Sequence, residues 1–258
     1  NQTMKGRGTI NGALRLAAGA TLAPGNSIDT LSVTGDFVLE KGAAFKVEYN
    51  GAASDMVVVG TGTAKSVNGT VVPTALADGT WNRLADFHAH RFTILRSPIA
   101  LNLRFDEIVS TAAIQARLEY RDLANNIVTD PLVAIGTVNM VLERVPYATL
   151  GGRGVRSQIG RGLDGILSTK DAQLGGVLDA IDSYDTQEKV RVVLDQLNPA
   201  AYNEVYALAL SRLQDVQKTV SDRRTGSVVA GRWNRQRMDC MDQRVWKLDY
   251  SAGQCGLG

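Results

Sequence analysis

The chain has 258 residues, enough for one large domain or two small ones. Hydrophobic residues make up 44% and charged residues 21%, so the chain can bury a core and does not have a disordered composition. The net charge of +2 is too small to indicate a nucleic-acid partner, and the local excess of arginine at residues 223–244 is read as a solvated linker rather than a phosphate site.

Residues 8–144 alternate apolar and polar side chains in short runs. Leu31 and Val33 share one face, as do Phe45, Val47 and Tyr49, so each run predicts a strand with one face on a core. Glycine, asparagine or aspartate separates almost every run. Two architectures fit: a sandwich or barrel of antiparallel hairpins, or a solenoid of stacked strands with glycine corners. The short runs and single-glycine turns favour the solenoid.

The runs become longer and less regular between residues 83 and 144. Phe92, Ile94 and Leu95 open this part of the chain. It is read as a terminal β-subdomain, because the last coil of a solenoid would otherwise expose an unpaired edge and an open core.

After Pro146 the pattern becomes helical. Val155, Ile159 and Leu163 lie at helical spacing, although the glycines between them weaken this helix by about 1 kcal/mol each relative to alanine. A second segment begins at an expected N-cap, Asp185 or Thr186, with Glu188 close behind.

The clearest helical pattern follows this cap. One apolar face is expected from Val190, Val193, Leu194 and Leu197, and Asn198-Pro199 is expected to end that helix and start the next. Helical spacing then continues through Tyr202, Tyr206 and Leu213 for about six turns. Core packing is the favoured role of the Tyr202/Tyr206 stripe, and a partner-binding face is the alternative.

The last twenty residues contain both cysteines, Cys240 and Cys255. Two cysteines do not make a zinc framework, so the alternatives are a disulfide in an oxidising compartment or two free thiols. No run of about 18 apolar residues predicts a transmembrane helix. The chain begins inside a patterned segment without a visible signal peptide, so we expect it to be part of a longer protein.

Candidate chemistry is sparse. Lys46, Glu48 and Asp55 would resemble the charged face of a solenoid enzyme, but strand alternation already predicts polar residues there. His88 and His90 form an H-x-H pair that would point to one side of a strand, without an obvious third metal ligand. The sequence therefore predicts no catalytic residue, no metal site and no cofactor.

Several motifs together resemble one known family. The stretch LAPGNSIDTLSVTGD resembles the theme G-x-L-x-P-G-x-S-x-G-T-L-x-V-x-G-D of bacterial autotransporter (type V secretion) passengers, with Asp29 where that family usually has glycine. GAAFKVEY and SDMVVVGT resemble the elements that follow it, RFTILRS the strand of the autochaperone region, and LDQLNPAAY the linker helix. NMVLERVPYATLGGRGVRSQIGRGLDGIL resembles the strand and first helix that follow RFTILRS. With the three stem elements counted as one, these four motifs occur in the family's order across roughly residues 8–225.

The resemblance implies a fold and a domain plan. The fold class is mainly β: a right-handed parallel β-helix with a β-rich C-terminal cap, followed by an α-helical linker. The implied parts are stem coils at 1–82, an autochaperone-like cap at 83–147, a helical linker at 148–225 and a short tail at 226–258. The tail is expected to be the start of a translocator barrel or an insertion ahead of it, since it is too short for the family's barrel.

The resemblance also implies a non-enzymatic role in folding and outer-membrane translocation of a surface-exposed virulence or adhesion protein. The implied partners are the protein's own C-terminal translocator barrel, the outer-membrane assembly machinery and a host-cell surface, with no nucleic acid. The implied location is the outer membrane, the cell surface or the medium. The alternatives are an adhesive β-helix module that binds host cells or glycans, and a polysaccharide-acting β-helix enzyme. Residues given a structural or folding role are Phe92, Ile94, Leu95, Leu197, Tyr202, Tyr206 and Leu213.

Overall fold

The computed structural model describes residues 2–60, 66–76, 83–102, 104–198 and 210–218. The strands are β1 (Thr3–Gly6), β2 (Gly8–Ile10), β3 (Leu14–Leu16), β4 (Thr21–Pro24), β5 (Thr30–Val33), β6 (Phe37–Leu39), β7 (Ala44–Tyr49), β8 (Met56–Val59), β9 (Ser66–Val67), β10 (Thr70–Ala75), β11 (His90–Leu101), β12 (Glu107–Ile108), β13 (Ile114–Arg121), β14 (Ile127–Val128) and β15 (Ile135–Arg144). The named helices are α1 (Tyr147–Gly151), α2 (Val155–Asp164), α3 (Ala172–Asp182) and α4 (Gln187–Gln196).

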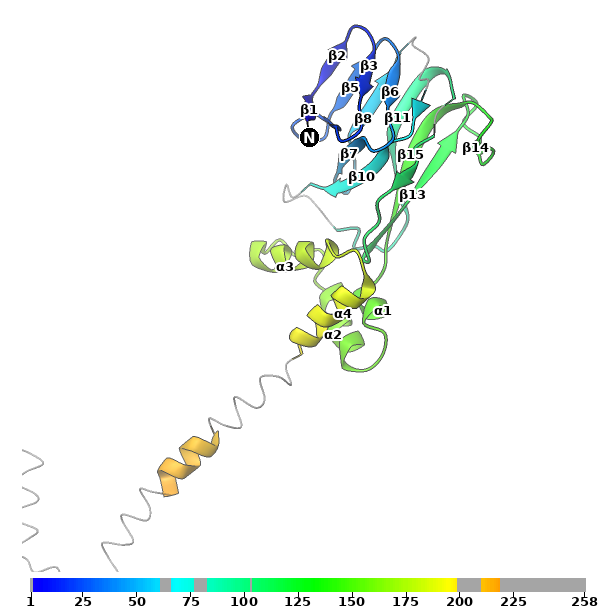
Figure 1. Cartoon of the computed structure of the whole chain (residues 1–258). Helices are drawn as coiled ribbons and strands as arrows, with labels where there is room; N and C mark the ends of the chain where they lie inside the picture. The colour runs from blue at the N-terminus through cyan, green and yellow to red at the C-terminus, as the bar shows by residue number, and fades with distance from the viewer. Residues whose placement is uncertain (1, 61–65, 77–82, 103, 199–209, 219–258) are drawn as a thin grey trace, which may run out of the picture. The chain divides into compact units, whose positions relative to one another are not determined.

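The strands form three sheets, and up to β11 each sheet takes every third strand of the chain (Figure 1). The five-stranded sheet has the order β1-β4-β7-β10-β12 and the three-stranded sheet the order β3-β6-β9, and all their pairs are parallel. The seven-stranded sheet has the order β14-β13-β15-β11-β8-β5-β2. Its strands from β2 to β11 pair in parallel, whereas β11, β15, β13 and β14 pair antiparallel.

The predicted fold class, a mainly β right-handed parallel β-helix with a β cap and a helical linker, is wrong. Parallel and antiparallel strands share the seven-stranded sheet, and helices supply most of a second hydrophobic core, so the described chain mixes α and β structure. The period-two pattern could not reveal this, because side chains alternate between faces in parallel and antiparallel strands alike.

The predicted alternation is confirmed in β3, β5, β6, β7 and β8, but not in β15, where residues 138–142 are all buried. Along β7 the side chains of Phe45, Val47 and Tyr49 are buried and those between them are partly exposed. Leu31 and Val33 are buried in the same way on β5. These side chains belong to one hydrophobic core that runs between the sheets and continues into β11 and β15.

The Pro24-Gly25 turn depends on glycine. Gly25 has φ +75°, and a Cβ placed there would lie 2.3 Å from the carbonyl oxygen of Ser27. Such a contact is sterically forbidden, and positive φ is costly for residues with a side chain. The turn in the opening motif is therefore fixed by backbone geometry.

The longest strand, β11, has neighbours of opposite polarity on its two edges. Leu95 faces Val57 of β8 in parallel register and Val138 of β15 in antiparallel register. The register with β15 shifts between Thr93 and Leu95, which lets Ile94 and Leu95 both be fully buried. A local irregularity of this kind re-aims side chains where a strand changes its partners.

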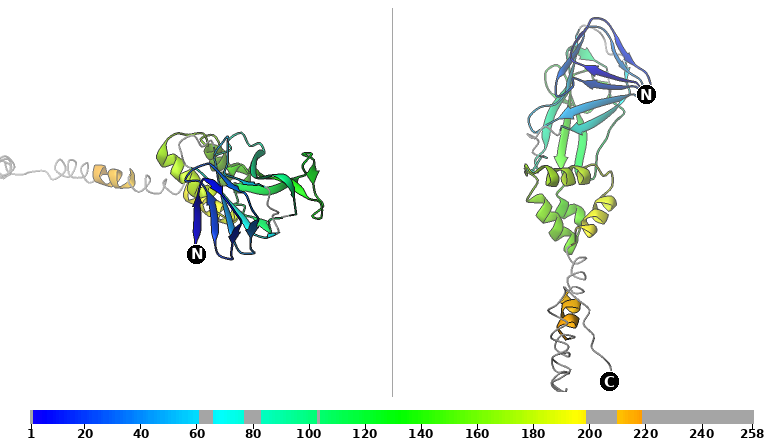
Figure 2. Two further views of the ribbon diagram at one scale, coloured as in Figure 1. Left: turned by 90° about the horizontal axis from the view of Figure 1, so that it is seen from above. Right: turned by 90° about the vertical axis from the view of Figure 1, so that its left-hand side faces the viewer.

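The helices form the second core together with the β12–β13 connection. α1, α2 and α4 pack together (Figure 2), and α3 adds Leu178 and Ile181 to the same core. The backbone N–H of Ala112, just before β13, donates to the carbonyl of Tyr184 at 2.8 Å, between α3 and α4. Asp171 caps α3 by accepting from the N–H groups of Gln173 and Leu174.

The glycine that looked unfavourable in the first helix has a packing role. A Cβ on Gly160 would lie 2.5 Å from the backbone of Tyr147 and Ala148, so α1 and α2 approach too closely for any side chain there. Asp164 then accepts hydrogen bonds from the N–H groups of Tyr147 and Ala148, which α1's own N-cap leaves without a side-chain partner.

Two of the predicted helices are observed as α2 and α4, with shorter bounds, whereas the long helix predicted after Pro199 is described only at residues 210–218. Val155 begins α2 but is 51% exposed rather than buried. Thr186 occupies the N-cap of α4 without a side-chain hydrogen bond. On the predicted apolar face of α4, Val190 and Leu194 are fully buried, whereas Leu197 is 39% exposed.

The chain divides into two compact units, residues 1–198 and residues 199–258. The described part of the second unit, residues 210–218, is helical, and Leu210, Leu213 and Val216 are exposed on it. No helix within the described ranges is both long enough and apolar enough to span a membrane.

We expect Leu95→Ala to lower the free energy of unfolding by about 2–5 kcal/mol, because it opens a cavity where three strands meet. Leu132→Ala is the matched control, since Leu132 is 87% exposed, and should change it by less than about 0.5 kcal/mol. Urea unfolding of both variants measures the difference, and equal stabilities would contradict the assignment of β11 to the core.

Candidate functional site

Five polar and aromatic side chains meet where the sheets adjoin the helices. Arg83 precedes β11, Arg144 ends β15, Tyr147 begins α1, and Asp179 and Asp182 lie three residues apart on one face of α3. We call this set the junction cluster.

Arg144 is the centre of the junction cluster, and its side chain is 0% exposed. Its two terminal nitrogens donate to the two carboxylate oxygens of Asp182, one of them at 2.9 Å. Its Nε donates to the backbone carbonyl of Arg83, and its guanidinium lies 5.3 Å from the ring centroid of Tyr147. A buried guanidinium with paired donors of this kind holds two elements in one orientation.

The surroundings of Tyr147 and Arg144 raise the pKa of both side chains. Burial raises the pKa of the Tyr147 hydroxyl well above its usual value, and the charge of Asp182 raises it further. Burial lowers the pKa of Arg144, but its hydrogen bonds to Asp182 and the charge of that carboxylate outweigh burial and raise it overall. At neutral pH Tyr147 therefore donates to Asp182 as a neutral phenol beside a charged arginine.

Arg83 forms the second ion pair of the junction cluster. Its Nε donates to Asp179 Oδ1 at 2.8 Å, and its side chain is only 9% exposed whereas that of Asp179 is 41% exposed. Gly175 lies directly beside it, because a Cβ there would be 2.7 Å from a terminal nitrogen of Arg83. The absence of a side chain at Gly175 gives the guanidinium room against α3.

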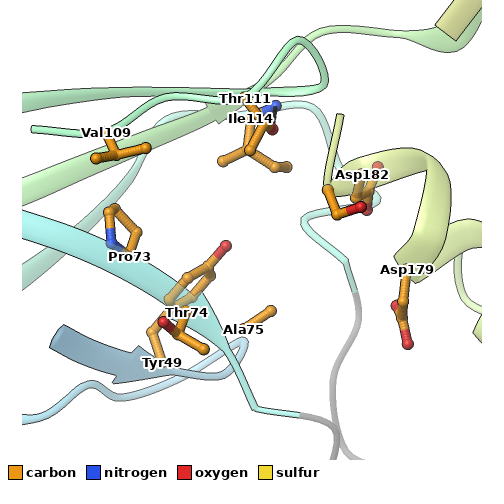
Figure 3. A pocket seen from close by; sticks show the side chains of 10 residues that line it. Tyr49, Pro73, Thr74, Ala75, Val109, Thr111, Ile114, Asp179 and Asp182 are labelled. Carbon is orange, nitrogen blue, oxygen red and sulfur yellow. Dashed lines mark hydrogen bonds between the residues drawn. The ribbon is translucent and has the colours of Figure 1, made fainter. Parts of the chain in front are cut away.

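A cavity of about 390 Å³ adjoins the junction cluster (Figure 3). Its lining residues come from β7, β10, the β12–β13 segment and α3: Tyr49, Pro73, Thr74, Ala75, Val109, Thr111, Ile114, Asp179, Asp182 and Ser183. The Tyr49 side chain is buried and its hydroxyl points into the space between β10 and α3. The size and the mixture of apolar walls with a few polar groups are typical of small-molecule sites.

The predicted H-x-H pair does not form a metal site in the structure. His90 Nε2 lies 2.8 Å from Asp86 Oδ1, and that hydrogen bond lowers the pKa of the Asp86 carboxyl. The His90 ring also stacks on Phe92, with centroids 6.4 Å apart. Across the described parts of the chain, no three histidine, cysteine, aspartate or glutamate side chains are placed to share a metal ion.

Asp55 is a buried turn residue rather than part of a charged face. It is 0% exposed, and its two oxygens accept from the backbone N–H groups of Asp29 at 2.9 Å and Glu48 at 2.8 Å. Burial raises the pKa of Asp55 to about 6, although both hydrogen bonds oppose that shift and the charges of Glu48 and Asp29 add to it. Lys46 pairs with Glu48 at 3.2 Å.

The predicted structural residues fall into three groups. Phe92, Ile94 and Leu95 are buried in the first core. Leu197 and Leu213 are exposed, at 39% and 62%. Tyr202, Tyr206, Cys240 and Cys255 lie outside the residues that the structure describes.

Sequence reasoning missed the whole junction cluster. Arg144 ends the apolar strand that begins at Ile135, and an arginine in a strand that is buried on both faces signals a buried partner. Asp179 and Asp182 share a helix face and were the available acceptors. Their meeting with Arg83 and Arg144, 96 and 38 residues away, was not visible in any local pattern.

Comparison with known proteins adds no relative. No family model matches the chain, and no curated protein matches it.

We expect Arg144→Met to lower the free energy of unfolding by about 3–5 kcal/mol, because it leaves the Asp182 carboxylate in a buried site without its cation. Arg156→Met is the control, since the Arg156–Asp195 pair is 43% and 48% exposed, and should cost less than about 1 kcal/mol. The double variant Arg144→Met/Asp182→Leu should recover part of the loss in urea unfolding. No recovery would contradict the assigned pairing.

Asp55 should give the fold a specific dependence on pH. Because its folded pKa of about 6 lies above its ordinary value of 3.8, its contribution to stability is fully present below pH 3.8 and is lost as pH rises to about 6. The two-unit difference corresponds to at most about 3 kcal/mol. Urea unfolding of wild type and Asp55→Asn at pH 4 and pH 6 isolates this effect as a difference, since other carboxylates titrate equally in both. A parallel pH dependence of the two proteins would contradict the raised pKa.

Proposed function

We propose that the chain is a non-enzymatic segment of an autotransporter passenger that supports folding and outer-membrane translocation of a surface-exposed protein. Its partners in this proposal are its own translocator barrel and the outer-membrane assembly machinery, and its location is the cell surface. The proposal rests on the four ordered sequence motifs and on the direction in which the strands are stacked.

The stacking direction is the single observation that supports the proposal best. The first three strands of the chain, β1, β2 and β3, each stand at the end of a different sheet, and each has its described neighbour on one side only. In the proposal, strands of a preceding segment pair with the other edge of these three strands. An edge of this kind is a template for further pairing.

At the other end of the parallel series in the seven-stranded sheet, antiparallel strands follow β11, and we call this the closed end. There β11 is covered by β15 and β13, and the junction cluster attaches the helices to the end of β15. In that sheet a further parallel strand would therefore pair with β2, on the N-terminal side of the parallel series. Such growth suits a chain that crosses the outer membrane with its C-terminal part folding first.

In this proposal the free energy of folding, rather than nucleotide hydrolysis, drives the movement of the chain. Each strand added to the open edge buries apolar area, which stabilises the folded side by roughly 25 cal/mol per Å². Folding outside the membrane would then bias the movement of the remaining chain, provided that the closed end is stable enough to act as the first template.

A surface-display experiment on the full gene product that contains these residues tests the proposal. Leu95→Asp places a charge in the core of the closed end and should strongly reduce surface-exposed, protease-resistant passenger. Leu132→Asp, on an exposed side chain, should display as well as the wild type. Deletion of residues 83–147 should leave the upstream part unfolded or unexported.

Normal folding and display of the Leu95→Asp variant or of the deletion would overturn the proposal. Loss of display in Leu132→Asp as well would show that the assay reports a general sensitivity to charge rather than the role of the closed end.

A further inference from the structure

The cavity between β10 and α3 shares Asp179 and Asp182 with the junction cluster. We propose that it binds a small organic ammonium compound with an apolar body, such as an arylalkylamine. This inference goes beyond the proposed function and does not depend on it.

The walls of the cavity suit the apolar body. Pro73 and Ala75 come from β10, and the ring of Tyr49 forms another wall (Figure 3). Val109 directly follows β12, and Ile114 begins β13. A volume of about 390 Å³ lies within the range of small-molecule pockets and accommodates one ring with a short side chain. Burial of such a ring against these side chains supplies the non-directional part of the affinity.

The α3 side of the cavity suits the ammonium group. Asp179 and Asp182 both line it, and none of the described residues in the lining is an arginine or a lysine. Among the described residues, Arg83 donates to Asp179 at Oδ1, and Oδ2 is an acceptor for a ligand N–H. Thr111 and Ser183 add hydroxyl groups to the same lining.

The sign of the local charge favours a cation over an anion. The two arginines of the junction cluster approach the carboxylates without lining the cavity themselves. Burial raises the pKa of the Tyr49 hydroxyl, and Asp182 raises it by more than Arg144 lowers it. A ligand ammonium group beside the Asp179 and Asp182 carboxylates is attracted to them, whereas a ligand carboxylate is repelled.

Three probes of nearly equal shape test the assignment: 2-phenylethylamine, 2-phenylethanol and phenylacetate. Each is titrated into the full chain at pH 7 while backbone amide shifts are followed by NMR. We expect the amine to bind about tenfold more tightly than the alcohol, with shifts at Ala75, Thr111 and Ser183, and phenylacetate to cause none there.

Two variants separate the charge from the shape of the cavity. Asp179→Asn keeps an acceptor for Arg83 and should remove the preference for the amine over the alcohol. Val109→Trp places a large ring at a cavity wall where Val109 is 40% exposed, so the fold should tolerate it, and both probes should lose binding. Asp185→Asn, on an exposed aspartate outside the lining, is the matched control and should behave as the wild type.

Equal affinity for the amine and the alcohol in the wild type would overturn the proposal. Amine-induced shifts that persist in Val109→Trp, or that disappear equally in Asp185→Asn, would also overturn it, because they would place the binding elsewhere or assign it to net charge alone.

Discussion

The rest of the structure depends on β11, which pairs in parallel with one neighbouring strand and antiparallel with the other. β11 continues the parallel series of β2, β5 and β8 on one edge and begins an antiparallel series with β15 on the other. A sheet edge cannot be left open beside a buried core without exposing unpaired backbone groups. The change of polarity at β11 resolves this, because a returning strand can cover the edge with residues from the same part of the chain.

The helices depend on that change in turn. β15 ends at Arg144. Its guanidinium is fully buried and donates to the backbone carbonyl of Arg83 and to the carboxylate of Asp182. Removing two charges from water is expensive, so such a pair contributes orientation more than net stability. Asp182 is bound by Arg144 and Tyr147 together, which fixes α3 against the start of α1. The cavity beside α3 is a consequence of this arrangement, since the carboxylates that hold the helix also face the space that the strands leave.

Local features of the fold could be predicted from the sequence, and long-range pairing could not. The burial of Phe45, Val47 and Tyr49 follows from alternation. Thr186 is one of the two predicted N-caps of α4, although its side chain makes no capping hydrogen bond. Strand polarity leaves no trace in that alternation, so the sequence could not show that parallel and antiparallel strands share one sheet. The junction cluster was invisible for a related reason, because its ion pairs join residues as far apart as Arg83 and Asp179. Asp55 looked like a surface charge, and only the fold shows that two backbone N–H groups bury it.

The central claim is that the strands are stabilised from the closed end of the stack toward the open one. Native-state amide hydrogen exchange measures this directly, because it reports the free energy of opening for each strand. The account predicts the strongest protection in β11 and β15, with protection falling through β8 and β5 to the open-edge strands β1, β2 and β3. Protection in β1–β3 equal to or greater than that in β11 and β15 would contradict it.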